Sequence, residues 1–216
     1  LILPMLYKEI SYQVKEMVDK SASDHERLLH MRGRPKILLA TSFEEAERYF
    51  KRFRLSTLGI ISDIRFSKDG KLDKKAGVKF ARWARSIDPS IPIMLQSKHS
   101  NNAELAKEVQ AHFLYKDSPS LLIELSEFVV RNFGFGDLIF RTPKGKELFT
   151  VSDLPALIKA IQTVPEESLL YHAKSNHFSN WLAAHGYLRL ASQVRPLNHA
   201  DFKNSNVHRA YLVGLI

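Results

Sequence analysis

Short apolar runs alternate with amphipathic stretches through roughly the first three fifths of the chain. Four runs have the continuous apolar character of strands that are buried on both faces. They are KILLATS (36–42), LGIISDI (58–64), IPIMLQS (91–97) and AHFLYK (111–116). Around them, apolar residues recur at helical spacing. Helices are predicted over about 4–31, 43–53, 74–87, 102–110 and 118–133, and the first of these either continues through DHERLLHM or restarts there. Such alternation predicts a parallel sheet that is covered by helices on both faces.

The pattern changes near Gly134 and Gly136. The stretch 137–151 (DLIFRTPKGKELFTV) has turn residues between two strand-like halves and predicts a β-hairpin. From Ser152 onward the pattern is helical, over 152–164, 165–186, 187–194 and a last helix after Asn204. We therefore predict two domains, an α/β doubly wound domain over 1–136 and a small, mainly α-helical domain with a hairpin over 137–216.

Composition excludes several classes of protein. The 216 residues are 44% hydrophobic and 25% charged, as in an ordinary globular chain, and no apolar run approaches membrane-spanning length. The absence of cysteine excludes disulfides and cysteine-ligated metals, and it fits a reducing, cytoplasmic compartment. The net charge of +9 is compatible with a nucleic-acid partner, but the basic residues are scattered without interleaved aromatics, which favours a solvated surface instead.

Polar side chains stand at the ends of three predicted strands. Asp63 stands near the end of the second apolar run, Ser97 ends the third and Lys116 ends the fourth. Because parallel strands direct their carboxyl ends to one edge of the sheet, these three residues are expected to converge there. A carboxylate, a hydroxyl and an ammonium group in one place fit the transfer of a phosphoryl group to the carboxylate.

These residues resemble the receiver domains of bacterial response regulators, over about residues 4–132. The resemblance implies a flavodoxin-like sheet of five parallel strands in the order 2-1-3-4-5. It also implies that Asp63 is the phosphoacceptor and that Ser97 and Phe113 are the switch residues. In the same resemblance, Lys116 corresponds to the lysine that ends the fifth strand of receivers. Asp63 and the backbone carbonyl of Arg65 would then contact a Mg²⁺ ion. The implied partners are a sensor kinase or a small phosphodonor, in a two-component phosphorelay.

The chain departs from the receiver pattern in two ways. It starts inside what corresponds to the first helix, so the first strand and the acidic pair that holds Mg²⁺ are missing, and we interpret the chain as a fragment. Mg²⁺ is accordingly expected only if an acidic pair precedes this sequence. The slot of the missing strand is expected to be filled by residues outside the chain, by a partner copy or by rearrangement. In addition, Ser67 stands where receivers usually have a proline.

A narrower resemblance covers nearly the whole chain. RGRPKILLATS, GIISDIRF and ESLLYHAKSNHFSNWL are similar to the N-terminal region of large bacterial proteins in which a receiver-like domain precedes a phosphoenolpyruvate synthase-type module. The resemblance implies a regulatory module without enzymatic activity of its own, acting on an attached or partner catalytic domain. The alternatives are a non-phosphorylated pseudo-receiver that serves as an interaction scaffold, possibly as a homo-oligomer, and a nucleic-acid-binding module.

Two histidines in the second half invite a metal-binding or phosphotransfer interpretation. His172 and His177 are five residues apart, which places them off a common helix face, unlike the four-residue spacing of helical zinc pairs. We therefore expect them to make hydrogen bonds within the helical domain, beside inward-facing Phe178 and Trp181.

Overall fold

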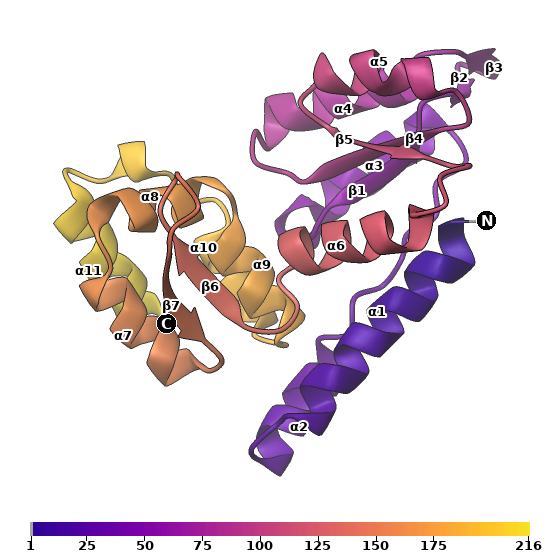
Figure 1. The fold of residues 1–216 in the computed structure, drawn as a ribbon. Helices are drawn as coiled ribbons and strands as arrows, with labels where there is room; N and C mark the ends of the chain where they lie inside the picture. The colour runs from indigo at the N-terminus through magenta and orange to yellow at the C-terminus, as the bar shows by residue number, and fades with distance from the viewer. Residues whose placement is uncertain (1) are drawn as a thin grey trace. The chain divides into compact units, whose positions relative to one another are not determined.

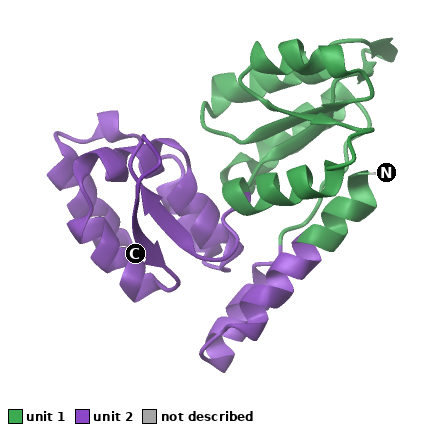
Figure 2. Cartoon of the chain, in the orientation of Figure 1, with its two compact units in different colours: residues 1–9, 35–132 green, residues 10–34, 133–216 purple. Residues whose placement is uncertain are grey.

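The computed structural model describes residues 2–216 and divides the chain into two compact units (Figure 2). The first unit comprises residues 2–9 and 35–132, and the second comprises 10–34 and 133–216. This division differs from the predicted boundary near residue 136. The chain crosses between the units near residue 133, and residues 10–34, which we had assigned to the α/β domain, group with the C-terminal part of the chain.

A parallel sheet of three strands forms the centre of the first unit. Its strands are β1 (Ile60–Asp63), β4 (Ile93–Ser97) and β5 (His112–Tyr115), in the order β1-β4-β5. The register pairs Asp63 with Gln96 and Ser97 with Tyr115. Three of the four predicted strands are thus confirmed, together with their parallel direction. The middle strand β4 is the most deeply buried, as its apolar residues Ile93–Leu95 predict.

Helices cover both sides of this sheet (Figure 1). They are α3 (Phe43–Phe53), α4 (Ala76–Ile87), α5 (Ala103–Lys107) and α6 (Leu121–Phe133), with short 3₁₀ turns at Arg54–Ser56 and Ser100–Asn102. Ser42 caps α3 by accepting a hydrogen bond from the Glu45 N–H at 3.2 Å. One continuous core joins α3, α4 and α5 to the sheet, with Phe50, Phe80 and Leu95 among its buried residues.

The structure corrects the prediction of a strand at 36–42. Residues 34–40 belong to no helix or strand, and Leu38 and Leu39 are 50% and 60% exposed. Among the described residues, the one β-type pairing of this segment is an isolated parallel bridge between Ser42 and Ser67. A strand needs a neighbouring strand to pair its backbone hydrogen-bonding groups. Among the described residues, no strand lies beside this segment in the way that β4 lies beside β1.

The segment after Asp63 forms a short hairpin. The antiparallel strands β2 (Phe66–Lys68) and β3 (Lys71–Asp73) are joined by Asp69 and Gly70, both with positive φ (51° and 71°). Two left-handed residues in a two-residue loop are typical of the Asp-Gly hairpin turn. The Glu44 carboxylate accepts a hydrogen bond from the Asp69 N–H at 2.9 Å and ties the turn to α3.

The second unit is mainly helical. Its only strands among the described residues are the antiparallel β6 (Leu138–Arg141) and β7 (Glu147–Val151), which confirm the predicted hairpin. The C-terminal helices are α7 (Leu154–Thr163), α8 (Glu166–Lys174), α9 (His177–Ala184), α10 (Leu188–Val194) and α11 (Ser205–Leu215), with a 3₁₀ turn at His199–Asp201. The predicted helix over 165–186 is therefore two helices, because Asn176 adopts a left-handed conformation between them.

The N-terminal helix is also divided in two. Helix α1 (Ile2–Asp19) ends before a turn, and Ser23 caps a new helix, α2 (Asp24–Arg32). The C-terminal end of α2 packs closely on the turn after α9, since a side chain at Gly33 would overlap the backbone of Gly186, and one at Gly186 would overlap the backbone of Leu29. No helix in the described part of the chain is long and apolar enough to cross a membrane.

Candidate functional site

Asp63 and Lys116 meet at the carboxyl edge of the three-stranded sheet. Asp63 is the last residue of β1, Lys116 follows β5 directly, and the Lys116 Nζ forms an ion pair with the Asp63 Oδ1. The lysine side chain is 22% exposed and the aspartate side chain 45%, so solvent reaches the pair mainly from the side of the aspartate. A carboxylate that is open to solvent and neutralised from the protein side has the arrangement of a nucleophile facing an anionic donor.

Ser97 lies at the same edge, but its hydroxyl serves its own loop. The Ser97 Oγ accepts hydrogen bonds from the His99 N–H at 3.0 Å and from the Asn102 Nδ2 at 2.8 Å. Its backbone carbonyl accepts from the Lys116 N–H at 2.9 Å, which fixes the start of the loop that carries the lysine. Of the three side chains expected to converge, Asp63 and Lys116 contact each other. The Ser97 hydroxyl is bonded to His99 and Asn102 of its own loop instead.

The other two residues assigned through the receiver resemblance lie at the sides of this edge. Phe113, on β5, is half-buried and packs against the core between the sheet and α3–α5. Arg65 is exposed, between β1 and the β2–β3 hairpin. Among the described residues, no group of three or more histidine or carboxylate side chains could hold a metal ion. One carboxylate with one backbone carbonyl does not make a Mg²⁺ site, since that ion requires near-octahedral oxygen coordination.

Two neighbours of Asp63 were not singled out from the sequence. Gln96 lies opposite Asp63 in the strand register, and its Oε1 is buried without a hydrogen-bond partner in the described part of the chain. Gly77, at the start of α4, donates its N–H to the Ile64 carbonyl at 2.9 Å, and a side chain there would overlap the Asp63 carbonyl oxygen. The glycine therefore allows α4 to begin directly against the end of β1. In the sequence, the one indication of this close backbone contact is a glycine just inside the helix predicted over 74–87.

The two histidines of the second unit form a buried pair. The Arg141 N–H donates to the His172 Nε2 at 2.8 Å, and the Nδ1 atoms of His172 and His177 lie 2.9 Å apart. The neutral His172 ring therefore carries its proton on Nδ1 and donates it to the His177 Nδ1. Burial lowers the pKa of His172 to about 3 and that of His177 to about 4. The pair has a structural role in the second unit, as the sequence led us to expect.

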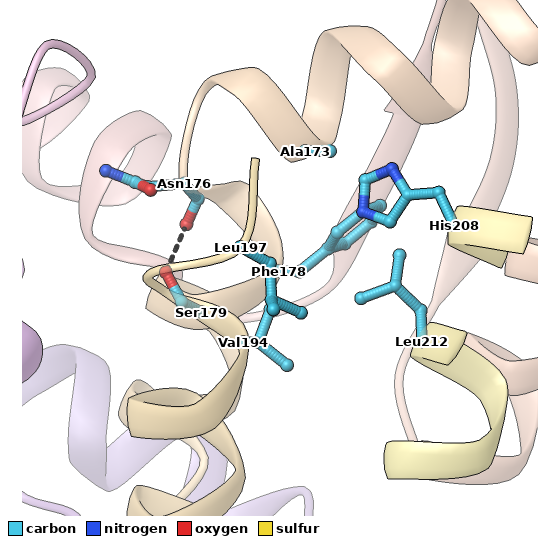
Figure 3. Close-up of a pocket in the computed structure, with 8 residues that line it drawn as sticks. All are labelled: Ala173, Asn176, Phe178, Ser179, Val194, Leu197, His208 and Leu212. Atoms are coloured by element: carbon cyan, nitrogen blue, oxygen red, sulfur yellow. Dashed lines mark hydrogen bonds between the residues drawn. The ribbon is translucent and has the colours of Figure 1, made fainter. Parts of the chain in front are cut away.

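The second unit also contains a small cavity (Figure 3). It is lined by α8, α9, α10 and α11, with Phe178, Leu212 and the buried His208 among its walls. Its volume is about 10 Å³, enough for one water molecule. The His208 ring stacks on Phe202 at 4.3 Å between centroids, and its Nδ1 lies 3.4 Å from that of His199. A cavity of this size does not hold a metabolite.

Comparisons with known proteins return no match. No protein-family model matches the chain, and neither a curated protein nor a solved structure matches it significantly.

Proposed function

We propose that this chain is a receiver-like regulatory module in which Asp63 accepts a phosphoryl group. The observation that carries the proposal is the ion pair of Asp63 with Lys116 at the carboxyl edge of a parallel sheet. Ligands of open α/β sheets bind outside this edge. The proposed flavodoxin-like order adds a strand beside β1, and the proposed output is control of an attached or partner catalytic domain in the cytoplasm.

The residues present account for part of the chemistry. In phosphoryl transfer, an Asp63 Oδ atom forms a bond to phosphorus while the bond from phosphorus to the donor oxygen breaks. The Lys116 ammonium group stabilises the negative charge of the transferred group, because it is held beside the carboxylate on a mostly buried side chain. The Mg²⁺ ion expected from the receiver resemblance would need carboxylates in addition to Asp63.

Intact-mass spectrometry after incubation with acetyl phosphate and MgCl₂ tests the proposal. We expect a phosphate-sized adduct on the parent chain and none on Asp63→Asn. The matched control is Asp69→Asn, since Asp69 is an exposed aspartate in the nearby hairpin turn and should leave the adduct unchanged. An adduct that persists in Asp63→Asn would place the modification elsewhere and refute the assignment.

The second candidate function is an interaction scaffold that never takes phosphate. It is favoured by the Ser97 hydroxyl, which is already engaged by His99 and Asn102, and by the single carboxylate at the site. Absence of the adduct from a chain shown to be folded by circular dichroism would favour this function. The nucleic-acid alternative predicts steeply salt-dependent binding to DNA, which a titration at two salt concentrations measures directly.

A further inference from the structure

The β2–β3 hairpin brings basic residues together at the margin of the first unit (Figure 1). Between positions 65 and 75 the chain has two aspartates and five basic residues, which are Arg65, Lys68, Lys71, Lys74 and Lys75. The hairpin folds this segment back on itself, so that Lys68 and Lys71 are directly opposite each other in the register. Like charges at opposite positions of a hairpin repel, and an anionic partner would remove that cost.

Most of this positive charge is not neutralised within the chain. Asp73 is already engaged, since its Oδ2 accepts a hydrogen bond from the Lys79 Nζ at 2.6 Å and its Oδ1 accepts one from the Lys75 N–H at 2.8 Å. The side chains of Lys71, Lys74 and Lys75 are exposed, and none of them forms an ion pair with another described residue. The outer part of the hairpin therefore presents uncompensated ammonium groups to its surroundings.

An apolar side chain stands among these lysines. Leu72 lies opposite Ser67 in the hairpin, and consecutive side chains of a strand point to opposite faces. Because Phe66 packs against the core of the first unit, Leu72 is on the hairpin face that is turned away from this core. It is 65% exposed, more than any other large apolar side chain of the described residues. A leucine between lysines fits a surface that has anionic groups outside and an apolar layer below them.

From these features we infer that the β2–β3 hairpin docks on the surface of an anionic lipid bilayer. Leu72 enters the boundary between headgroups and acyl chains, while Lys71 and Lys74 contact the lipid phosphates. The exposed leucine favours this partner over a nucleic acid, because residues 66–73 include no Asn, Gln or exposed aromatic side chain with which to contact bases. The docking is peripheral and reversible, and it does not depend on phosphorylation of Asp63.

Co-sedimentation of the full chain with vesicles tests this inference. At low ionic strength we expect binding to vesicles of equimolar phosphatidylcholine and phosphatidylglycerol, and none to phosphatidylcholine alone. Changing Lys71 and Lys74 together to Gln should weaken binding about twenty-fivefold, at about fivefold per lysine. The matched control changes Lys144 and Lys146, two exposed lysines at the turn of the β6–β7 hairpin, to Gln and should bind as the parent does. Absence of binding to the anionic vesicles, or an equal effect of the two double variants, overturns the inference.

A second pair of variants separates lipid binding from nucleic-acid binding. Leu72→Ser keeps every charge and should weaken vesicle binding about tenfold, because serine gains little from the apolar layer. Leu122→Ser, at a side chain of α6 that is 58% exposed, is the matched control and should leave vesicle binding unchanged. Binding of a labelled DNA duplex is measured by fluorescence anisotropy in the same buffer. Vesicle binding that is unaffected by Leu72→Ser overturns the inference, and duplex binding that the lysine changes weaken would then assign the surface to nucleic acid.

Discussion

Acidification should destabilise the second unit through its buried histidine pair. Neutral His172 accepts from the Arg141 N–H through Nε2 and donates through Nδ1 to His177. Protonation of His172 would place a second proton on Nε2, against the Arg141 N–H, and protonation of His177 would place one on Nδ1, against its donor. Burial among Phe140 and Phe178, together with the nearby Arg141 guanidinium, also disfavours the charged rings.

The size of the effect follows from the two protonation states. The pKa of His172 is 6.5 in an ordinary environment and about 3 in the folded unit, since burial and His177 both lower it. Above pH 6.5 both folded and unfolded chains hold the ring neutral, so this group adds no pH dependence. Below that pH only the unfolded chain takes up the proton, and between pH 7 and pH 5 the free energy of unfolding falls by about 2 kcal/mol for this one histidine.

Urea unfolding at pH 7 and pH 5 measures this loss. Trp181 lies in the second unit and Trp83 in the first, so Trp181 fluorescence in a Trp83→Phe background reports on the second unit alone. His172→Gln removes the titrating ring and keeps a side-chain acceptor for the Arg141 N–H. We expect this variant to be less stable than the parent at pH 7 and to lose about 2 kcal/mol less between pH 7 and pH 5.

The control variant is His25→Gln, at an exposed position of α2, which makes the same chemical change away from the pair. It should keep the pH dependence of the parent chain. The reasoning would be refuted by a His172→Gln variant that loses as much stability between pH 7 and pH 5 as the parent does.

Two further predictions concern glycines that permit close backbone contacts. In thermal unfolding, Gly77→Ala should lower the stability of the first unit by more than about 1 kcal/mol although alanine favours helices, because its methyl group would overlap the Asp63 carbonyl. Gly214→Ala, in α11 with open space around it, is the control and should be neutral or slightly stabilising in the same assay. Gly186→Ala should expose α2 to proteolysis, because φ there is +86° and the methyl group would overlap Leu29; an unchanged digestion pattern would contradict the packing described.

Local sequence was sufficient where an element depends mainly on its own residues. The apolar runs that end at Asp63 and Ser97 are strands, and Ser42 caps α3 with its hydroxyl on the Glu45 N–H. Burial on both faces and side-chain capping are properties of a few neighbouring residues, which explains why these elements could be predicted. The hairpin turn at Asp69 and Gly70 also has a local signal in the sequence, the Asp-Gly pair.

Part of the candidate site could also be predicted from the sequence. The alternation of strands and helices placed Asp63 and Lys116 at one edge, and their ion pair is present. The partners of the Ser97 hydroxyl could not be predicted, because they depend on how the following loop returns to bring Asn102 within 2.8 Å. The sequence also does not show that Gln96 lies opposite Asp63 with a buried Oε1, because that position depends on the register between β1 and β4.

By itself, then, the sequence determined the periodic elements, the direction of the sheet and the edge at which its polar residues gather, because each depends on side-chain pattern and backbone chirality. Only the tertiary structure decided that residues 36–40 form no strand, since a strand exists through its neighbour's hydrogen bonds. It also decided that residues 10–34 group with the C-terminal unit and that His172 meets His177 across the left-handed Asn176. These are contacts between residues whose partners no local pattern specifies.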